Sequence, residues 1–471
     1  MKFANVQKST FALFFGNRGF FPASLIAEAR ETLPRVLGSL GHKTLMLEAE
    51  ATRYGAVETT REGQIYAEFL RQHQGEFDGV ILCLPNFGDE TGAVAALKDA
   101  NVPILVQAYP DELDKMSPAL RRDAYCGKLS IGDVFRQYGV KYSTLKPHVV
   151  HPESKDFAKN IDHFDRVCRV VKGMRSMIVG AIGARTTPFK TVRIDEIALQ
   201  KHGITVETVD MATVIHRMHT LVKDDAFNKK AILLGSVASW QGVPEKAFEN
   251  AVRLAVVLDQ IIDEYQMDAI AIRCWTELQE QMGISPCVAV GALNDLGLSA
   301  ACEVDLGSAV TMHALHLASA QPAACLDWNN NYADADDKCI LFHCGPIPAS
   351  LMLEKGQITD HAILANSVGE GCSYGCNTGR IAPFEFTFGN VLTENGKMRW
   401  YLGTGKFTKD RIPEDFFGCA GVAKIENLED VLMHIVRTGH RHHTNLTPGD
   451  HVAVLQEALG YYLNEEVCLP Q

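Results

Sequence analysis

MDAIAIRCWTE at residues 267–277 and LGLSAACEVD at residues 296–305 are two apolar segments that each end in acidic side chains. The acids are Glu277 in the first segment, and Glu303 and Asp305 in the second. Moving a carboxylate out of water costs several kcal/mol unless it is paired or bound to a cation. If the two segments are neighbouring buried strands, their ends predict a site for a divalent metal ion, and therefore an enzyme.

Each acidic group also has a simpler structural explanation. Glu277 is suited to the first turn of a helix, where the helix dipole stabilises a negative charge. Glu303 and Asp305 are suited to capping a helix that we expect over residues 307–318. For each acidic residue considered alone, the structural explanation is as good as a role in a metal site. The acids follow two successive strands of one predicted sheet, and this repetition favours a shared site.

The length, charge and cysteine content of the chain limit the classes of protein to which it can belong. A chain of 471 residues exceeds the size at which one hydrophobic core stops growing, so we expect two or three domains. Its 45 basic and 57 acidic side chains form no basic stripe, and we expect no nucleic-acid partner. No apolar run reaches the ~18 residues of a membrane helix. The thirteen cysteines are spread through apolar contexts, which predicts reduced thiols and a cytoplasmic protein.

Residues 1–172 are predicted to form an N-terminal α/β domain. Strand patterns at 11–15, 44–48, 79–84 and 102–107 alternate with helical patterns, which is typical of a parallel sheet covered on both faces. Ligands of such sheets bind at the carboxyl ends of the strands. Asn17 and Arg18 directly follow the first strand. No glycine loop has the spacing of a dinucleotide-binding or phosphate-binding motif.

Two further domains are predicted. Residues 173–335 again alternate strands and helices, which indicates a second Rossmann-like α/β domain that carries the acidic groups. The polar stretch Asn329–Asp337 is the expected boundary. Residues 336–471 contain several strand patterns and few helices, which predicts a β-rich, barrel-like C-terminal domain.

Histidines could complete a metal site. His343 ends an apolar strand, where a single histidine is more often a hydrogen-bonded core residue. A group of histidines near the C-terminus, which includes His442 and His443, is equally typical of a solvated loop. Carboxylates with one imidazole suit Mn²⁺, Mg²⁺ or Co²⁺ better than zinc.

These residues resemble the L-fucose isomerase/L-arabinose isomerase superfamily, and specifically its fucose-isomerase-like branch. The resemblance covers nearly the whole chain. It implies two α/β domains and a β-rich C-terminal domain, Mn²⁺-dependent interconversion of aldoses and ketoses through an enediolate, and assembly as a trimer or hexamer. The motifs that carry it are Arg273–Glu277, Gly283–Cys287, Ala301–Asp305, Phe342–Gly345, His442–Thr444 and the loop Gly180–Pro188.

The resemblance also implies roles for single residues. Glu277 matches the first acidic metal ligand, and His443 matches the C-terminal ligand. The second acidic ligand corresponds to Asp305 in the fucose branch and to Glu303 in the arabinose branch, where His343 matches a further ligand. We rank Glu277, Asp305 and His443 first, and we expect Glu277 and Asp305 to be the acid/base pair that moves the proton between C2 and C1.

The identity of the sugar is left open by the sequence. Asn17 and Arg18 are candidates for contacting it, because in this family the first domain, often that of a neighbouring subunit, helps to close the site. Arg18 or Arg185 could pair with an anionic sulfo-sugar such as sulfoquinovose, although a neutral deoxy-sugar or pentose is equally compatible. Trp275 and His442 are further candidates for substrate binding. A non-catalytic sugar-binding protein and a metal-dependent epimerase or aldolase are the alternative functions.

Overall fold

The computed structural model describes residues 6–470, which divide into two compact units. The N-terminal unit contains residues 7–172 together with the segment Glu457–Leu463 near the end of the chain. The large unit contains residues 173–456 and the residues from Asn464 onward. The two α/β sheets and the β-rich sheet predicted from the sequence are all present, and the fold class is therefore confirmed.

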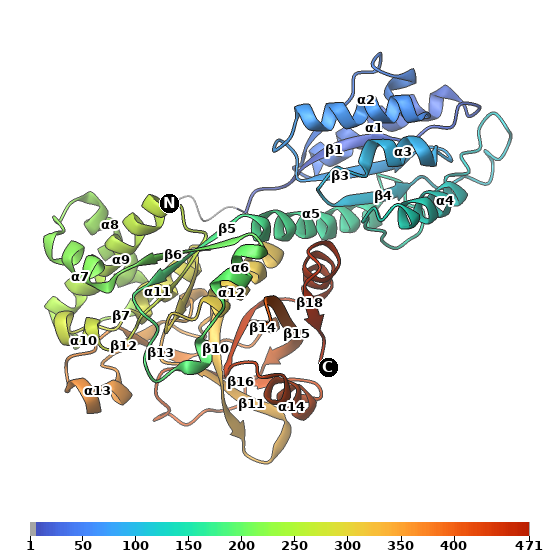
Figure 1. The fold of residues 1–471 in the computed structure, drawn as a ribbon. Helices are drawn as coiled ribbons and strands as arrows, with labels where there is room; N and C mark the ends of the chain where they lie inside the picture. The colour runs from blue at the N-terminus through green and yellow to red at the C-terminus, as the bar shows by residue number, and fades with distance from the viewer. Residues whose placement is uncertain (1–5, 471) are drawn as a thin grey trace. The chain divides into compact units, whose positions relative to one another are not determined.

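A four-stranded parallel sheet in the order β2-β1-β3-β4 forms the centre of the N-terminal unit (Figure 1). Successive side chains of a strand point to opposite faces, so Phe11 and Phe14 of β1 pack into two different cores. Helices α1 and α5 cover one face, and α2, α3 and α4 cover the other. The elements are β1 Thr10–Phe15, α1 Ala23–Ser39, β2 Lys43–Met46, α2 Thr60–Gln72, β3 Gly79–Leu84, α3 Glu90–Leu97, β4 Ile104–Ala108, α4 Ala124–Gln137 and α5 Lys155–Arg175.

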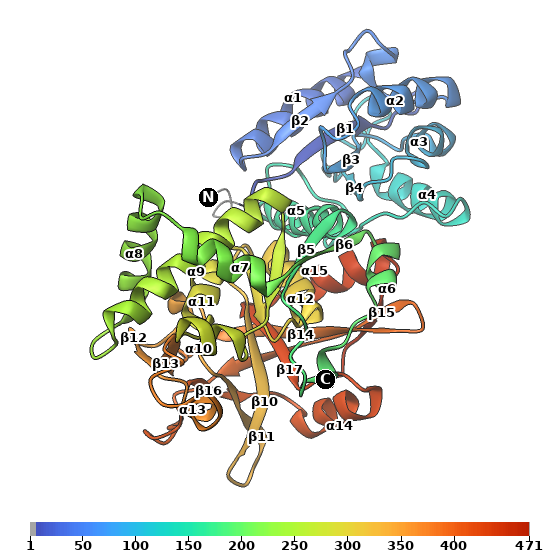
Figure 2. The same cartoon turned by 60° about the vertical axis from the view of Figure 1, so that its left-hand side comes forward.

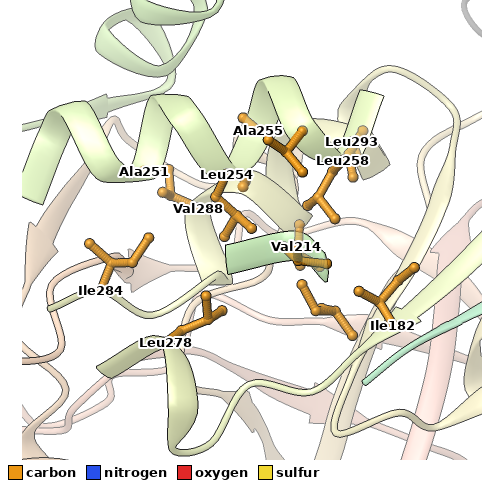
Figure 3. Packing of buried hydrophobic residues seen from close by; sticks show 14 of the residues in the cluster. Ile182, Val214, Ala251, Leu254, Ala255, Leu258, Leu278, Ile284, Val288 and Leu293 are labelled. Carbon is orange, nitrogen blue, oxygen red and sulfur yellow. The ribbon is translucent and has the colours of Figure 1, made fainter. Parts of the chain in front are cut away.

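A second parallel sheet, in the order β6-β5-β8-β9, begins the large unit. Its main core lies between this sheet and α7 to α11 (Figure 3), and α12 packs against β5, β8 and β9. The elements are β5 Met177–Ile182, α6 Glu196–Lys201, β6 Ile204–Val209, α7 Met211–Thr220, α8 Asp225–Val237, β7 Ala238–Ser239, α9 Glu245–Tyr265, β8 Ala269–Ile272, α10 Glu277–Met282, α11 Cys287–Asp295, β9 Ser299–Cys302 and α12 Leu306–Ser319.

The rest of the large unit is built on a mixed sheet of ten strands. Six of them, β14-β17-β10-β11-β16-β15, close into a barrel, because β15 pairs with both β14 and β16 (Figure 2). The elements are β10 Ala324–Tyr332, β11 Ala335–His343, β12 Gly356–Thr359, α13 Ala362–Val368, β13 Cys376–Arg380, β14 Glu385–Glu394, β15 Lys397–Phe407, β16 Cys419–Lys424, α14 Leu428–Thr438, β17 His443–Pro448, α15 Val452–Leu455, a π-helical turn over Gln456–Tyr462 and β18 Glu466–Cys468.

The central α/β part and the barrel lie in the same unit. Strand β7 of the α/β part pairs with β12 of the large mixed sheet, and α12 packs against β14 and β17. The polar stretch Asn329–Asp337, which we expected to separate two domains, forms the end of β10, a turn and the start of β11. Its polar residues are suited to the outer end of this hairpin, which is largely exposed. Among residues 6–470, no helix combines the length and the apolar character needed to cross a bilayer.

Candidate functional site

The turn after β9 carries two of the predicted acidic residues. β9 ends at Cys302, and the next two residues, Glu303 and Val304, have left-handed backbones with φ of 63° and 57°. This conformation costs on the order of 1 kcal/mol or more for a residue other than glycine, and it is concentrated at functional sites. It joins the buried strand to α12, with Glu303 and Asp305 both buried.

Asp305 is the N-cap of α12, as the capping explanation of the sequence proposed. Its Oδ1 accepts a hydrogen bond from the Ser308 amide at 3.0 Å, and its Oδ2 accepts from the Ser308 hydroxyl at 2.7 Å. Arg441 donates to Oδ1, and Nδ1 of His443 lies 2.7 Å from Oδ2. Burial by itself would raise the pKa of Asp305, but the Arg441 charge and the bonds from His443 and Ser308 hold it well below its usual range. Both carboxylate oxygens are therefore occupied.

His443 lies at the centre of the polar cluster. It is the first residue of β17 and stands directly opposite Asp327 of β10. Its Nε2 is 3.1 Å from Oε2 of Glu303 and 3.4 Å from Oδ1 of Asp327. These three atoms are buried, and none of them takes part in a described hydrogen bond. The structure thus gathers two carboxylate oxygens around one imidazole nitrogen, and His442 Nε2 lies 3.6 Å from Asp327 Oδ1.

The electrostatics of this cluster favour a positive charge beside Glu303 and Asp327. Burial opposes protonation of His443, yet neighbouring Cys325, the hydrogen bond with Asp305 and the nearby Glu303 carboxylate raise its pKa well above the usual value. Burial also raises the pKa of Asp327 to about 7, although His443 partly offsets the effect. Two carboxylates beside one imidazole are also suited to a cation.

Two other predicted histidines lie next to His443. The rings of His442 and His443 are 4.2 Å apart, and potential ligand atoms of Glu303, His442 and His443 lie within 4.8 Å of one another. His343, at the end of β11, has its ring 5.8 Å from that of His443 and forms a second such group with His443 and Cys325. Burial lowers the pKa of His343 and of His442, the latter to about 4, so both are neutral imidazoles near pH 7.

Glu277 begins α10, and its described partner is Arg273. The Arg273 Nε donates to Glu277 Oε2 at 2.5 Å, and the same guanidinium donates to the carbonyls of Ala184 and Arg185. Burial opposes ionisation, but the bond from Arg273 lowers the pKa of Glu277, which is therefore a carboxylate near neutral pH. Glu277 and Arg273 line a cavity of about 630 Å³ together with Asp210, His216, His219 and Gln281.

Phe189, in the loop after β5, contacts both Trp275 and His442. The ring of Phe189 lies 4.9 Å from that of Trp275 and stacks on His442 at 5.4 Å. Arg185 donates to the carbonyls of Thr186 and Phe189 in its own loop. The Arg185 guanidinium is thus bound by neutral carbonyl oxygens of the same loop that carries Phe189.

Asn17 and Arg18 belong to the N-terminal unit and form a network there. Asn17 donates to Glu58 at 2.7 Å and accepts from Asn86 at 2.7 Å. Arg18 is paired with Glu90 at 2.6 Å and lies over the Phe87 ring. The charge of Arg18 is therefore balanced by a carboxylate, in contrast to that of Arg185.

Asp327, Phe189 and Arg441 are among the residues around His443 that were missed in the sequence. Asp327 is an acid inside the apolar run Ala323–Leu326 and Trp328, and the rule that singled out Glu303 would have found it. Phe189 and Arg441 carry no comparable signal, because their importance comes from contacts with residues that are distant in the sequence.

Two family models match the chain. The fucose/sulfoquinovose isomerase N-terminal domain matches residues 12–175, and the L-fucose isomerase C-terminal domain matches residues 341–470. The matched regions together make up more than half of the chain. The second contains His343, His442 and His443.

Several curated proteins are similar over much of their length. The sulfoquinovose isomerase of Priestia aryabhattai is 22% identical over 414 residues, which cover 84% of this chain and 87% of that protein. The sulfoquinovose isomerase of Alkalicoccus urumqiensis is 21% identical over 323 residues, covering 67% and 70%. The family models and these relatives agree, and the chain therefore belongs to the fucose-isomerase-like family of aldose–ketose isomerases.

Proposed function

We propose that this protein is a divalent-metal-dependent isomerase that converts a sulfonated aldose, such as sulfoquinovose, into the corresponding ketose. The observation that carries the proposal is the convergence of three buried atoms without described hydrogen bonds, Glu303 Oε2, Asp327 Oδ1 and His443 Nε2. Buried polar atoms normally have partners, so a group of them that face one another indicates a ligand.

The residues fit a divalent ion. Glu303 and His443 would hold it, and the resemblance adds Glu277 from the end of the neighbouring strand. An oxygen-rich set with one imidazole suits Mn²⁺, Mg²⁺ or Co²⁺. When bound, such an ion stabilises negative charge that develops on the sugar oxygens during isomerisation.

The proton transfer requires a carboxylate that is free to accept a proton. Glu277 comes closer to this requirement than Asp305, because it is ionised, is partly exposed, lines a cavity and has Arg273 as its described side-chain partner. Asp305 does not meet it, since four hydrogen bonds occupy its oxygens. We therefore propose Glu277 as the group that carries the proton between C2 and C1, with Asp305 holding His443 in place.

Recognition of a sulfonate is assigned to Arg185. The relatives named above are sulfoquinovose isomerases, and a sulfonate needs a cationic hydrogen-bond donor. Arg185 donates to carbonyls of its own loop, which leaves its charge available for an anion. Phe189 of the same loop stacks on His442, so the loop lies against the cluster.

A substrate panel tests the function. Metal-stripped protein is incubated with sulfoquinovose, L-fucose, D-arabinose and D-glucose, with and without Mn²⁺, and the products are identified by NMR. We expect a ketose from sulfoquinovose only when Mn²⁺ is present. D-glucose is the matched control, because it carries a hydroxyl group in place of the sulfonate.

The same assay on Glu303→Gln is expected to show at least a 100-fold loss of turnover, because the variant loses a charged ligand while keeping its shape. Ketose formation without metal would contradict the metal-dependent site. Formation of a C2-epimer in place of a ketose would contradict isomerisation. The predicted trimer or hexamer stays a prediction, and light scattering coupled to gel filtration measures it directly.

A further inference from the structure

We propose that Cys287 and Cys344 form a reversible disulfide when a hydroperoxide reaches the protein, and that this bond controls the neighbouring polar cluster. The two cysteines belong to the sequence motifs Gly283–Cys287 and Phe342–Gly345. Neither has a role in the isomerisation proposed above. The inference therefore goes beyond the proposed function, because the bond can be detected whether or not the protein isomerises a sugar.

Three buried thiols form a cluster in the large unit. Cys287 begins α11, Cys344 directly follows β11, and Cys376 begins β13. The sulfur of Cys287 lies 3.8 Å from that of Cys344 and 4.0 Å from that of Cys376. Phe342 and Phe417 pack against the three thiols. Cys287 thus stands between two other sulfurs, each close enough to become its partner.

Two glycines next to the cysteines bring these chain segments together. Gly345 has a φ of 145°, and a Cβ at this position would lie 3.0 Å from Cys376 Cα. Gly375 has a φ of 142°, and a Cβ at this position would lie 2.1 Å from the carbonyl oxygen of Ser285. Glycine combines this backbone conformation with so close an approach. The backbone itself therefore holds the thiols side by side.

Cys344 is the expected point of attack. It is 9% exposed, whereas Cys287 and Cys376 are 0% exposed, so a small hydroperoxide such as hydrogen peroxide meets Cys344 first. Transfer of one peroxide oxygen to the Cys344 sulfur breaks the O–O bond, gives a sulfenic acid and releases water.

The neighbouring thiol then completes the reaction. The Cys287 sulfur attacks the Cys344 sulfur, the S–S bond forms, the S–O bond breaks, and the hydroxyl leaves as water with the proton of the Cys287 thiol. The two thiols lose two electrons in total, and the peroxide takes them up. Because the Cys287 sulfur is only 3.8 Å away, this step is intramolecular and is favoured over reaction with a thiol from solution.

The disulfide would act on the site through His343. The Cys344 sulfur lies 3.3 Å from His343 Nδ1, and the Cys344 amide donates to the same nitrogen at 3.0 Å. An S–S bond of about 2.05 Å requires the two sulfurs to move about 1.8 Å closer, which changes this contact. The His343 ring is 5.8 Å from that of His443. We therefore expect oxidation to lower turnover at least tenfold and reduction to restore it.

Disulfide mapping of the full-length protein tests the proposal. The protein is treated with hydrogen peroxide, the remaining thiols are blocked with N-ethylmaleimide, and its peptides are compared by mass spectrometry with and without dithiothreitol. We expect a crosslinked peptide that contains Cys287 and Cys344 and is lost on reduction. Turnover is measured on the same samples.

Two variants sharpen the test. Cys287→Ser is expected to give no crosslink to Cys344, and dimedone should label the sulfenic acid that remains at Cys344. Cys339→Ser is the matched control, because Cys339 is also a buried thiol and lies in β11. We expect the crosslink to form in this variant as in wild type. If Cys287→Ser does not fold, the wild-type peptide map decides by itself.

Each other outcome has a distinct meaning. A crosslink between Cys287 and Cys376 would overturn the assignment of Cys344, and so would a sulfinic acid at Cys344 without any crosslink. Three unmodified thiols at a peroxide concentration that oxidises the exposed Cys126 would also overturn it. Full turnover by the crosslinked protein would overturn the control of the site. A protein that forms the crosslink but isomerises no sugar before oxidation would contradict the proposed function and still support the disulfide.

Discussion

The carboxylate of Asp305 and the imidazole of His443 face each other, with Oδ2 2.7 Å from Nδ1. The contact joins the N-cap of α12 to the first residue of β17, two positions separated by 138 residues of sequence. A carboxylate at Nδ1 keeps a proton on that nitrogen, so Nε2 is the nitrogen that would bind an ion. Arg441 forms an ion pair with the other carboxylate oxygen of Asp305, Oδ1.

Asp305→Asn is predicted to weaken Mn²⁺ binding about 10- to 100-fold by releasing His443 from this orientation. Pulsed electron paramagnetic resonance of the Cu²⁺-loaded protein detects Nδ1, the imidazole nitrogen remote from the ion. We expect its modulation frequencies to shift in the variant, because the hydrogen bond to Nδ1 changes. Unchanged frequencies together with weaker binding would show that Asp305 does not act through His443.

Arg185→Gln is predicted to impair only the anionic substrate. Loss of a charge-assisted hydrogen bond is worth about 1.5–3 kcal/mol, so we expect KM for the sulfonated aldose to rise about 10- to 100-fold. Turnover of any neutral aldose accepted by the wild type should not change. Arg193→Gln is the control, because Arg193 lies exposed near the end of the same loop and donates to a loop carbonyl. Equal losses on both classes of sugar would argue against sulfonate recognition by Arg185.

Asp165→Asn is predicted to destabilise the N-terminal unit by about 3 kcal/mol at pH 7, the lower end of the range for removing one partner of a buried ion pair. Asp165 is fully buried, accepts from the Ser9 amide at 2.9 Å and faces Lys8 and Arg169. Burial opposes ionisation, but Arg169 and the bonds from Ser9 outweigh it and lower the pKa of Asp165.

The sign of the pH effect follows from that lowered pKa. The folded protein binds the Asp165 proton less readily than the unfolded chain does, so the stabilisation is present above the unfolded pKa of about 3.9. It is lost as the pH falls through the lower folded value. Urea unfolding followed by circular dichroism should show a constant difference between wild type and variant from pH 5 to 8, and a shrinking difference below pH 4. A difference that grows on acidification would contradict this account.

Leu258→Ala is predicted to lower the stability of the large unit by about 3 kcal/mol, because it leaves a cavity in a close-packed core. Leu258 is 0% exposed and points from α9 into the cluster shown in Figure 3. Ile232→Ala on α8 is the control, since Ile232 is 75% exposed and its truncation should change stability by less than about 0.5 kcal/mol. Thermal unfolding of both variants measures the contrast, and similar melting temperatures would contradict the assignment of Leu258 to the core.

The architecture could be predicted because its signals are local. Apolar runs such as Gly79–Leu84 identify buried parallel strands, and the alternation of strand and helix patterns identifies the two α/β sheets. The stretch Asn329–Asp337, which we predicted as a domain boundary, forms a hairpin, and its polar, exposed strand ends have the composition of a linker.

The candidate site could be predicted only in part. The acids after β8 and β9 and the paired histidines were identified from residue type and position, and the structure brings Glu303, Asp305, His442 and His443 together. The roles within that group depend on partners that are remote in sequence. Arg441, which saturates Asp305, is 136 residues away from it.

The sequence by itself determined which segments are buried strands and which polar residues stand at their ends, because hydrophobic periodicity and desolvation act on neighbouring residues. Only the tertiary structure decided which carboxylate has both oxygens hydrogen-bonded and which one faces the histidines. The N-cap of α12 and Arg441 take up the oxygens of Asp305, while the β10–β17 register places Asp327 opposite His443. Hydrogen-bond saturation is a property of the folded surroundings, and two aspartates of identical chemistry therefore differ in what they can bind.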